Sequence, residues 1–413
     1  MRVTGIIAEY NPFHNGHAYH LNQARELTGA EYVLVALSGP FTQRGEPAIA
    51  DKWARTRMAL SCGADLVLEL PFAYAAQSAE WFARGGVSIL DKTGVVTDIC
   101  FGMESDSLEP LKAIARTAAK ENRVFKKTLK RSLKEGQSFP AARAEALSES
   151  LAAGSESLRE MVKQPNNILA VEYFKSLLLL KSRINPVGVR REGTGYHDEK
   201  TAGSYASASY IRKRIGEGRL DTVASYMPEA AYEILRDCVH KGQAPVFPEA
   251  YDTAVLACLR RATPDQIALW PDVSEGLENR LQRLAQETSG VEELVDAAAT
   301  RRYTYARIRR ILAYGLVGLT RRELDRYKRA GGPGYLRVLG FNESAVPLIK
   351  AIQENASLPL VMSPAKALKE MKSRSARAQL LLDIRAQNLY DLGMPGTDKR
   401  TGNRDYYQPY IHP

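Results

Sequence analysis

Short apolar segments alternate with amphipathic segments over the first 215 residues. The apolar runs "VTGIIAEY", "YVLVALSG", "DLVLELPF" and "TDICFGM" are each followed by a stretch in which apolar positions recur with helical spacing. Short apolar runs separated by helices are typical of parallel strands that are buried on both faces. The pattern predicts an α/β domain with a doubly wound parallel sheet of the Rossmann type, in which ligands bind beyond the carboxyl ends of the strands.

The pattern changes after this alternating part. Residues 121–164 are highly charged with helical spacing and predict a helical insertion, after which "NPVGVRRE" and "SASYIRKRIGEG" complete a first domain at residues 1–218. The periodic segments of residues 219–413 are helical, with Pro and Gly between them, so we expect a mainly α second region. Its polar end, "GTDKRTGNRDYYQPYIHP", is expected to be loosely held.

The charge of the chain favours an anionic partner. The formal net charge is +10, and residues 301–345 hold eleven Lys or Arg against three acidic residues. Tyrosines are interleaved with them, among which Tyr303, Tyr305, Tyr327 and Tyr335 are candidates for stacking. Basic side chains release counterions from a phosphate backbone and aromatic rings stack on unpaired bases, so this region suits RNA. A solvated helix face is the alternative. The arginines predicted to contact RNA are Arg301, Arg302, Arg307 and Arg310.

Cysteine usage and hydropathy indicate a cytoplasmic protein. The four cysteines lie far apart without a CxxC pair, which argues against a structural zinc site or a disulfide framework and favours a reducing compartment. No stretch approaches the roughly 20 apolar residues that span a membrane.

The turn after the first apolar run predicts an anion site. In "NPFHNGH", residues 11–17, Pro12 stiffens the turn, Gly16 removes a side chain where a ligand approaches, and a helix begins with unpaired N–H groups. His14 and His17 lie three positions apart across the helix start, where both imidazoles can donate hydrogen bonds to phosphoryl oxygens. A surface histidine pair is the alternative. Zinc is disfavoured because its helical pairs are spaced i, i+4.

Two segments resemble one enzyme superfamily. "HNGH" resembles the HxGH signature of nucleotidyltransferases and class I aminoacyl-tRNA synthetases, and "SASYIRKRI" resembles their later phosphate-binding segment ISxxxIR. By this resemblance Ser207 and Ser209 open a helix and bind phosphate, while Arg212 and Lys213 neutralise the outer phosphates of ATP. An N-capped basic helix is the alternative interpretation of the second segment.

Several longer strings are similar to the bacterial tRNA(Met) cytidine acetate ligase family. They are "EYNPFHNGH", "QRGEPAIADKWARTRMAL", "LVLELP", "FARGGVSIL", "FGMES", "QPNNIL", "YASASYIRKRI" and "RRYTYARIRRIL", which together cover most of residues 1–345. The resemblance implies an ATP-dependent ligase that attaches acetate to the wobble cytidine of elongator tRNA(Met) through an acetyl-adenylate, giving N4-acetylcytidine, AMP and pyrophosphate. The family string "KPNNIL" is "QPNNIL" here, with Lys163 one position earlier.

The same resemblance implies the site residues. His14, Gly16 and His17 would be catalytic. Gly102 would let adenosine approach, Asn167 would read the nucleotide, and Arg191 would bind it; a turn glycine, a helix cap and a surface charge are the respective alternatives. Mg²⁺ is expected with ATP, although no carboxylate cluster indicates a metal site. The residues implied in ATP binding are Ile7, Ala8, Glu9, Tyr10, Asn11, Pro12, Phe13, His14, Asn15, Gly16, His17, Ala18, Tyr19, His20, Gly102, Asn167 and Arg191.

Three other functions remain as alternatives. A small-molecule adenylyltransferase needs both phosphate segments but no basic helical half, and a non-catalytic RNA-binding protein leaves those segments unexplained. An aminoacyl-tRNA synthetase needs a KMSKS motif after its catalytic domain, whereas "EMKSRS" lies at residues 370–375. A polar loop after the second strand is a candidate for the acetate or cytidine pocket, without assigned roles. It carries Gln43, Arg44, Glu46, Asp51, Lys52 and Arg55.

Overall fold

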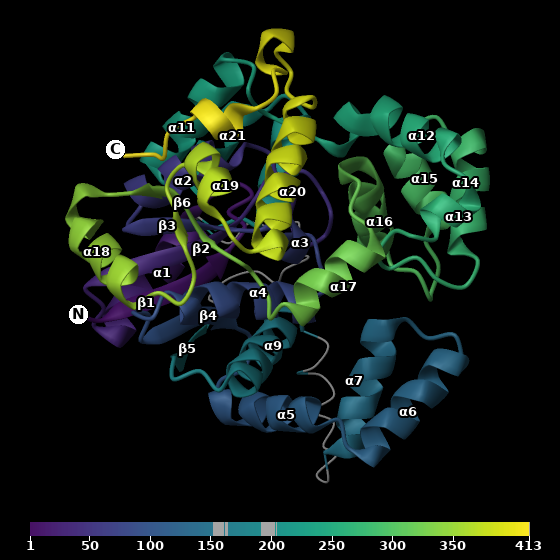
Figure 1. The fold of residues 1–413 in the computed structure, drawn as a ribbon, viewed down its shortest axis with the longest axis horizontal. Coiled ribbons are helices and arrows are strands. Elements are labelled where there is room, and N and C mark those ends of the chain that lie inside the picture. The colour runs from purple at the N-terminus through teal and green to yellow at the C-terminus, as the bar shows by residue number, and fades with distance from the viewer. Residues whose placement is uncertain (152–160, 162–163, 191–202, 204, 413) are drawn as a thin grey trace.

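The computed structural model describes the whole chain except residues 152–160, 162–163, 191–202, 204 and 413 (Figure 1). Its centre is a seven-stranded sheet with the order β5-β4-β1-β2-β3-β6-β7. The strands are β1 (Val3–Ala8), β2 (Tyr32–Ser38), β3 (Leu66–Leu70), β4 (Asp98–Met103), β5 (Asn185–Arg190), β6 (Leu336–Phe341) and β7 (Leu360–Val361).

The first five strands confirm the predicted parallel sheet. β1 lies between β2 and β4, and all neighbouring pairs among β1–β5 are parallel. Successive side chains of a strand point to opposite faces, and in β2 Val33 and Val35 pack in one apolar cluster while Leu34 and Ala36 pack in another. Both faces are therefore buried, which explains why the strand is apolar along its whole length.

The helices of the alternating part cover both faces of this sheet. The helical insertion predicted at residues 121–164 contains the antiparallel pair α6 and α7, which lies beside α5 and projects away from the sheet in Figure 1. The helices are α1 (Asn15–Thr28), α2 (Lys52–Ser61), α3 (Phe72–Ala75), α4 (Ala79–Lys92), α5 (Leu108–Lys120), α6 (Arg123–Lys134), α7 (Phe139–Ser150), α9 (Pro165–Leu180) and α10 (Ala208–Gly216).

The second half is mainly helical, as expected. Its α-helices are α11 (Glu229–His240), α12 (Asp252–Arg261), α13 (Pro264–Ile267), α14 (Leu277–Glu287), α15 (Val291–Ala298), α16 (Tyr305–Val317), α17 (Arg321–Arg329), α18 (Val346–Asn355), α19 (Pro364–Glu370), α20 (Arg374–Asp391) and α21 (Arg404–Tyr407). Short 3-10 turns are η1 (Leu220–Tyr226), η2 (Pro248–Tyr251), η3 (Glu343–Ala345) and η4 (Thr397–Lys399).

Two strands of the sheet come from this second half, which the sequence pattern did not predict. β6 pairs antiparallel with β3, with Leu66 opposite Phe341, and β7 pairs parallel with β6. All six residues of β6 are buried. A short segment that is buried on both faces has no alternating pattern to distinguish it from a helical segment, and β6 also carries the charged Arg337. The sheet therefore extends across the predicted boundary at residue 218.

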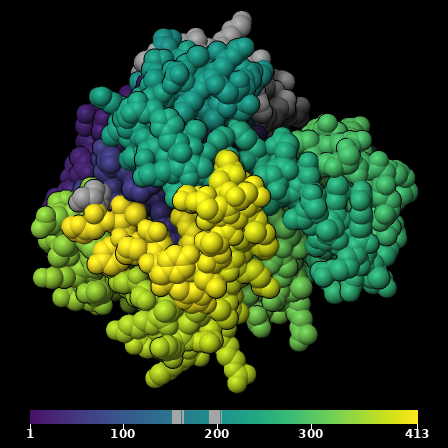
Figure 2. Space-filling model, turned by 90° about the horizontal axis from the view of Figure 1, so that it is seen from above, coloured from purple at the N-terminus to yellow at the C-terminus, as the bar shows by residue number. Residues whose placement is uncertain are grey.

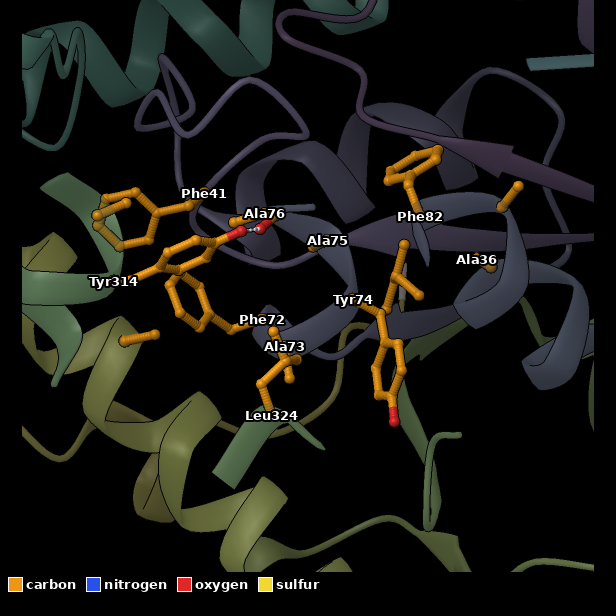
Figure 3. Close-up of a cluster of buried hydrophobic side chains, with 14 of the residues drawn as sticks. Ala36, Phe41, Phe72, Ala73, Tyr74, Ala75, Ala76, Phe82, Tyr314 and Leu324 are labelled. Atoms are coloured by element: carbon orange, nitrogen blue, oxygen red, sulfur yellow. Dashed lines mark hydrogen bonds between the residues drawn. The ribbon is translucent and has the colours of Figure 1, made fainter. Parts of the chain in front are cut away.

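The helical half docks on the carboxyl end of β3 through aromatic side chains (Figure 3). Tyr314 of α16 donates a hydrogen bond to the carbonyl of Ala76 at 2.6 Å, and its ring meets that of Phe72 edge to face at 6.4 Å. Phe41 also packs edge to face on Phe72, with ring centroids 5.6 Å apart. These aromatic contacts hold α16 against the segments that follow β2 and β3.

The expectation of a loosely held C-terminal tail was wrong. Asp405 is completely buried, and Ile411 exchanges backbone hydrogen bonds with β6, donating to Leu339 and accepting from Phe341. Figure 2 shows this yellow segment packed between the teal residues around α11 and the lime-green residues around α18. Two charged residues of the tail, Arg404 and Asp405, form ion pairs with buried side chains, which composition alone does not reveal.

The four cysteines are free thiols, and Cys100 and Cys238 are buried. Within the described ranges, no helix has both the length and the apolar character needed to cross a bilayer.

Candidate active site

A cavity of about 280 Å³ opens beyond the carboxyl ends of β1, β4 and β5. Its lining comes from β1 and the turn after it, from α1, from residues 42–46, and from β4, β5, α9 and α10. This is the edge of a parallel sheet at which ligands bind. Of the predicted turn and helix start, ten residues line it: Ile7, Ala8, Glu9, Tyr10, Asn11, His14, Gly16, His17, Tyr19 and His20. Pro12, Phe13, Asn15 and Ala18 do not, and Phe13 belongs to the core.

His14 and His17 are brought together at the start of α1. His14 is the N-cap residue, and its Nδ1 accepts a hydrogen bond from the backbone N–H of Gly16 at 3.1 Å. His17 Nδ1 accepts in turn from the backbone N–H of His14 at 3.3 Å. The two rings stack with their centroids 3.7 Å apart. Both imidazoles are therefore held in defined positions at the N-terminus of α1.

These hydrogen bonds determine the tautomer of both histidines. A neutral imidazole carries its proton on one nitrogen only, and an Nδ1 that accepts a hydrogen bond leaves that proton on Nε2. Each ring thus has an Nε2–H donor in its neutral form. Two such donors at the positive end of a helix suit the oxygens of a phosphoryl group.

Gly16 is required by the close approach of the His14 ring. A Cβ atom built on Gly16 would lie 2.9 Å from His14 Cε1 and 3.1 Å from its Nδ1. Any side chain at this position would push the imidazole out of place. Gly16 is therefore a positioning residue for His14, which refines the catalytic role expected for it from the sequence.

The second predicted segment reaches the first one in space. Ser207 is the N-cap of α10 and accepts from the N–H of Tyr210, as expected for a helix-opening serine. Arg212 donates to the carbonyl of Asn11 at 2.8 Å and to the hydroxyl of Ser209 at 3.4 Å. Ser207, Ser209 and Arg212 line the cavity, whereas Lys213 is exposed and is not among the lining residues. Segments about 200 residues apart thus form one site.

Glu9 places a carboxylate in this cavity. Burial raises the pKa of Glu9, although a hydrogen bond from the Gln43 backbone and the charges of Arg212 and Arg44 act in the opposite direction. Glu46 lies 3.8 Å from Arg212 and 3.6 Å from Arg309 of α16, so it connects the phosphate segment to the helical half. The loop of residues 42–46, to which no role was assigned, therefore forms one wall of the site.

Asn167, which was expected to bind the nucleotide, forms hydrogen bonds within the protein. Its side-chain oxygen accepts from the N–H groups of Glu104 and Ser105, and its amide donates to Gln164 at 2.6 Å. Asn167 is completely buried and does not line the cavity, whereas its neighbour Asn166 does. Its polar atoms hold the connection that leaves β4.

Gly102 lines the cavity as predicted, from within β4. The predictions for Arg191 and Lys163 fall outside the residues that the structure describes.

Arg55 supports the site from beneath. Its guanidinium is completely buried and donates to the carbonyls of Glu9 at 2.7 Å, Ser38 at 3.0 Å, Gly39 at 2.5 Å and Ala50 at 2.9 Å. It therefore connects the carboxyl ends of β1 and β2. Arg55 was a candidate for the acetate or cytidine pocket. It does not line the cavity and instead supports the backbone of the site.

Lys52 has a similar structural role. Its ammonium lies 2.8 Å from both Glu69 and Asp405, and Arg337 of β6 pairs with the same two carboxylates. All four side chains are buried. Burial alone would raise the pKa of Asp405, but Arg337 and Lys52 hold it below its usual value. This cluster fastens the C-terminal tail beneath the site.

Part of the predicted RNA surface is used internally. Arg307 donates to the carbonyl of Asp272 at 2.7 Å and to the hydroxyl of Ser274 at 2.9 Å, and Arg310 pairs with the Asp272 carboxylate at 3.4 Å. Tyr303, Tyr327 and Tyr335 are buried, so their rings are not available to stack on bases.

Two of the predicted RNA contacts and one tyrosine remain at the surface of this region. Arg301 and Tyr305 are exposed, and Arg302 is half-buried and paired with Glu275.

Comparisons with known proteins agree with this geometry. A family model described as HIGH Nucleotidyl Transferase matches residues 1–405. The tRNA(Met) cytidine acetate ligase of Acetivibrio thermocellus is 42% identical over 415 residues and that of Halothermothrix orenii is 40% identical over 420 residues, each covering 100% of this chain and at least 99% of the relative. The crystal structure of Thermotoga maritima TmcAL bound with alpha-thio ATP matches with a TM-score of 0.94 at 36% identity, covering 100% of this chain and 99% of that one.

The sheet, the paired histidines at the start of α1 and the converging α10 define a nucleotidyl transferase of the HIGH class. The sequence identity to the two relatives is 42% and 40%, and the alignments cover the full length of this chain. The chain belongs to the tRNA(Met) cytidine acetate ligase family.

Proposed function

We propose that this chain activates acetate with ATP and transfers the acetyl group to the wobble cytidine of elongator tRNA(Met), forming N4-acetylcytidine. The observation that carries the proposal is the hydrogen bond from Arg212 to Asn11, because it joins both phosphate-binding segments beside His14 and His17. The names of the relatives supply acetate and the tRNA, and the neighbouring crystal structure contains an ATP analogue.

In the first step an acetate oxygen attacks the α-phosphorus of ATP, and the bond to pyrophosphate breaks. Negative charge grows on the phosphoryl oxygens, where the Nε2–H groups of His14 and His17 donate hydrogen bonds. Arg212 and the N–H groups at the start of α10 hold the leaving pyrophosphate. The protein contributes positions and charges and forms no covalent bond to the substrate.

Mg²⁺ accompanies ATP as part of that substrate. Its ligands are then largely phosphate oxygens and water, which is the usual mode of magnesium binding in nucleotide sites. In the part of the chain that the structure describes, no group of three or more His, Cys, Asp or Glu side chains is placed to hold a metal ion.

In the second step the N4 amine of the cytidine attacks the acetyl carbon of the acetyl-adenylate. The amine loses a proton and AMP leaves, so the acetyl group ends on the base. The base has to leave its stack to reach a cavity at the end of a sheet. The four free thiols suit a reducing cytoplasm, where we place this reaction.

We further propose that the helical region of residues 219–413 contributes to tRNA binding. Deletion of this region would remove β6 from the sheet and Asp405 from its ion pairs, so the full chain is needed for a test. Arg301→Gln is the suitable variant because Arg301 is exposed. We expect weaker tRNA binding and a flatter salt dependence with acetate-dependent exchange unchanged.

Isotope exchange between pyrophosphate and ATP, dependent on acetate and measured without tRNA, tests the first step. We expect exchange in the wild type, and a loss of at least about 100-fold in His14→Ala and His17→Ala because each variant removes a donor to the transition state. His240→Ala is the control, since His240 is exposed at the end of α11. Full exchange in the His14 and His17 variants would reject the assigned roles.

A small-molecule adenylyltransferase is the competing function. It would show nucleotide transfer to another substrate and no acetyl group on tRNA. Wild-type protein that leaves the mass of tRNA(Met) unchanged in the presence of ATP and acetate would favour this alternative.

A further inference from the structure

A row of exposed basic side chains lies on α6, outside the candidate site. Residues spaced by three or four positions share one face of a helix. Arg123, Lys127, Lys130 and Lys134 have the spacing 4, 3 and 4, so they lie within an arc of about 60° along roughly 16 Å of helix. We call these four residues the α6 stripe. All four are exposed.

The stripe lies opposite the face by which α6 is held. Phe125, Thr128 and Ser132 are buried on the far side of the helix, and Ser132 donates to Glu145 of α7 at 2.8 Å. The neighbouring Arg131 is paired with Glu145 and Glu149 of α7. In the described part of the chain, the four residues of the stripe form no such ion pair. Among those described residues, their charges therefore point outward without an acidic partner.

Like charges at this spacing repel one another along the helix, and an anionic partner relieves that repulsion. The apolar face of α6 is packed against α7, as the burial of Phe125 shows. A helix that binds a membrane surface needs that apolar face for the lipid. A partner that presents charge alone, such as a phosphate backbone, fits the stripe better.

The hairpin has a fixed relation to the active site. Arg143 of α7 forms an ion pair with the buried Glu172 of α9, and Lys175 of α9 pairs with Glu80 of α4 at 2.7 Å. The same helix α9 contributes Tyr173 to the cavity. In Figure 1 the hairpin of α6 and α7 extends beyond α5 and α9, away from the sheet. A nucleic acid on the stripe would thus be held at a defined place relative to the cavity.

We propose that the α6 stripe binds the phosphate backbone of the tRNA substrate, as a second RNA contact besides the helical half. This inference rests on the proposed function for the identity of the RNA. It gives the basic residues of the insertion a role in RNA binding. A second contact is also useful because Arg307 and Arg310, which the sequence placed on the RNA surface, contact Asp272 instead.

The test is a triple variant, Lys127→Gln/Lys130→Gln/Lys134→Gln, which removes three charges and keeps good helix-forming residues. Binding of elongator tRNA(Met) is measured as a function of salt. Each lost phosphate contact lowers the log–log salt slope by about 0.7 to 0.9, so we expect a slope smaller by about 2 and a Kd roughly 10- to 100-fold higher at 0.1 M salt. Acetate-dependent exchange without tRNA is expected to stay at the wild-type rate, which also shows that the variant folds.

The matched control is Lys120→Gln/Lys181→Gln/Arg183→Gln, which makes the same charge change at exposed basic residues at the carboxyl ends of α5 and α9, outside the stripe and outside residues 219–413. Its tRNA affinity is expected within about threefold of the wild type. Equal tRNA affinity in the stripe variant and the control would overturn the inference.

Two further outcomes are decisive. Stripe-dependent binding to vesicles of phosphatidylserine and phosphatidylcholine, with tRNA affinity unaffected, would overturn the inference in favour of a membrane. Absence of acetate-dependent exchange in the wild type, with stripe-dependent tRNA binding intact, would reject the proposed reaction and leave the stripe as an RNA contact.

Discussion

Replacement of Gly16 by alanine adds a single methyl group at the catalytic turn. The added Cβ would lie 2.9 Å from His14 Cε1, so the ring has to move by several tenths of an ångström or leave its rotamer. A rotamer change of that kind costs about 0.5–1.5 kcal/mol, while alanine in place of glycine gains up to about 1 kcal/mol of helix propensity. The free energy of unfolding should therefore change by less than about 1 kcal/mol.

The effect on catalysis should be much larger. Misplacement of a catalytic group by about 1 Å costs on the order of 100-fold in rate, so we expect acetate-dependent exchange to fall roughly 10- to 100-fold in Gly16→Ala. The assay is the rate of exchange at saturating ATP and acetate, together with thermal unfolding of the same protein.

Gly216→Ala is the control for this prediction. It adds the same methyl group in the last turn of α10, where the new Cβ would make an ordinary contact of 3.4 Å with Phe247. We expect its exchange rate to equal that of the wild type. An exchange rate in Gly16→Ala within twofold of the wild type would refute the reasoning that His14 has to be held in this position.

Three further predictions concern the framework of the site. Arg55→Met leaves several buried carbonyls without a donor and should lower the free energy of unfolding by about 3–5 kcal/mol in urea titrations; an unchanged midpoint would contradict the role of Arg55 in joining β1 and β2. Burial, with the charge of Glu69, raises the pKa of Asp383 to about 7, so the folded protein holds a proton that the unfolded chain releases. The contribution to the free energy of unfolding is fully present below about pH 4 and is lost as the pH rises through 7, by up to about 4 kcal/mol. Asp383→Asn should not show this loss. The same dependence of the unfolding free energy on pH in the wild type and the variant would disprove the role of Asp383. Arg307→Gln should lower the Tm, because Arg307 holds the carbonyl of Asp272, and a lower tRNA affinity with an unchanged Tm would instead assign Arg307 to the RNA surface.

The sequence was sufficient for the fold of the first half and for the centre of the site. Buried parallel strands produce uninterrupted apolar runs, and the turn of residues 11–17 combines a helix start with two histidines, both of which are local features. The later phosphate segment was recognisable because Ser207 and Arg212 stand at fixed positions of one helix start.

What could not be predicted depends on partners that are distant in sequence. Asp405 lies in a polar tail, yet it is buried because it forms ion pairs with Lys52 and Arg337. Both partners are more than 60 residues away in the sequence. Asn167 satisfies the N–H groups of Glu104 and Ser105, which only the folded chain brings to it. For the same reason, a count of charges over residues 301–345 does not reveal that Arg307 and Arg310 contact Asp272.

The measurement that tests the central claim most directly is the mass of elongator tRNA(Met) after incubation with the wild-type protein, ATP and acetate. The account predicts the gain of one acetyl group on the wobble cytidine, dependent on all three components and absent with the His17→Ala variant. An unchanged tRNA mass under conditions that support acetate-dependent exchange would contradict it.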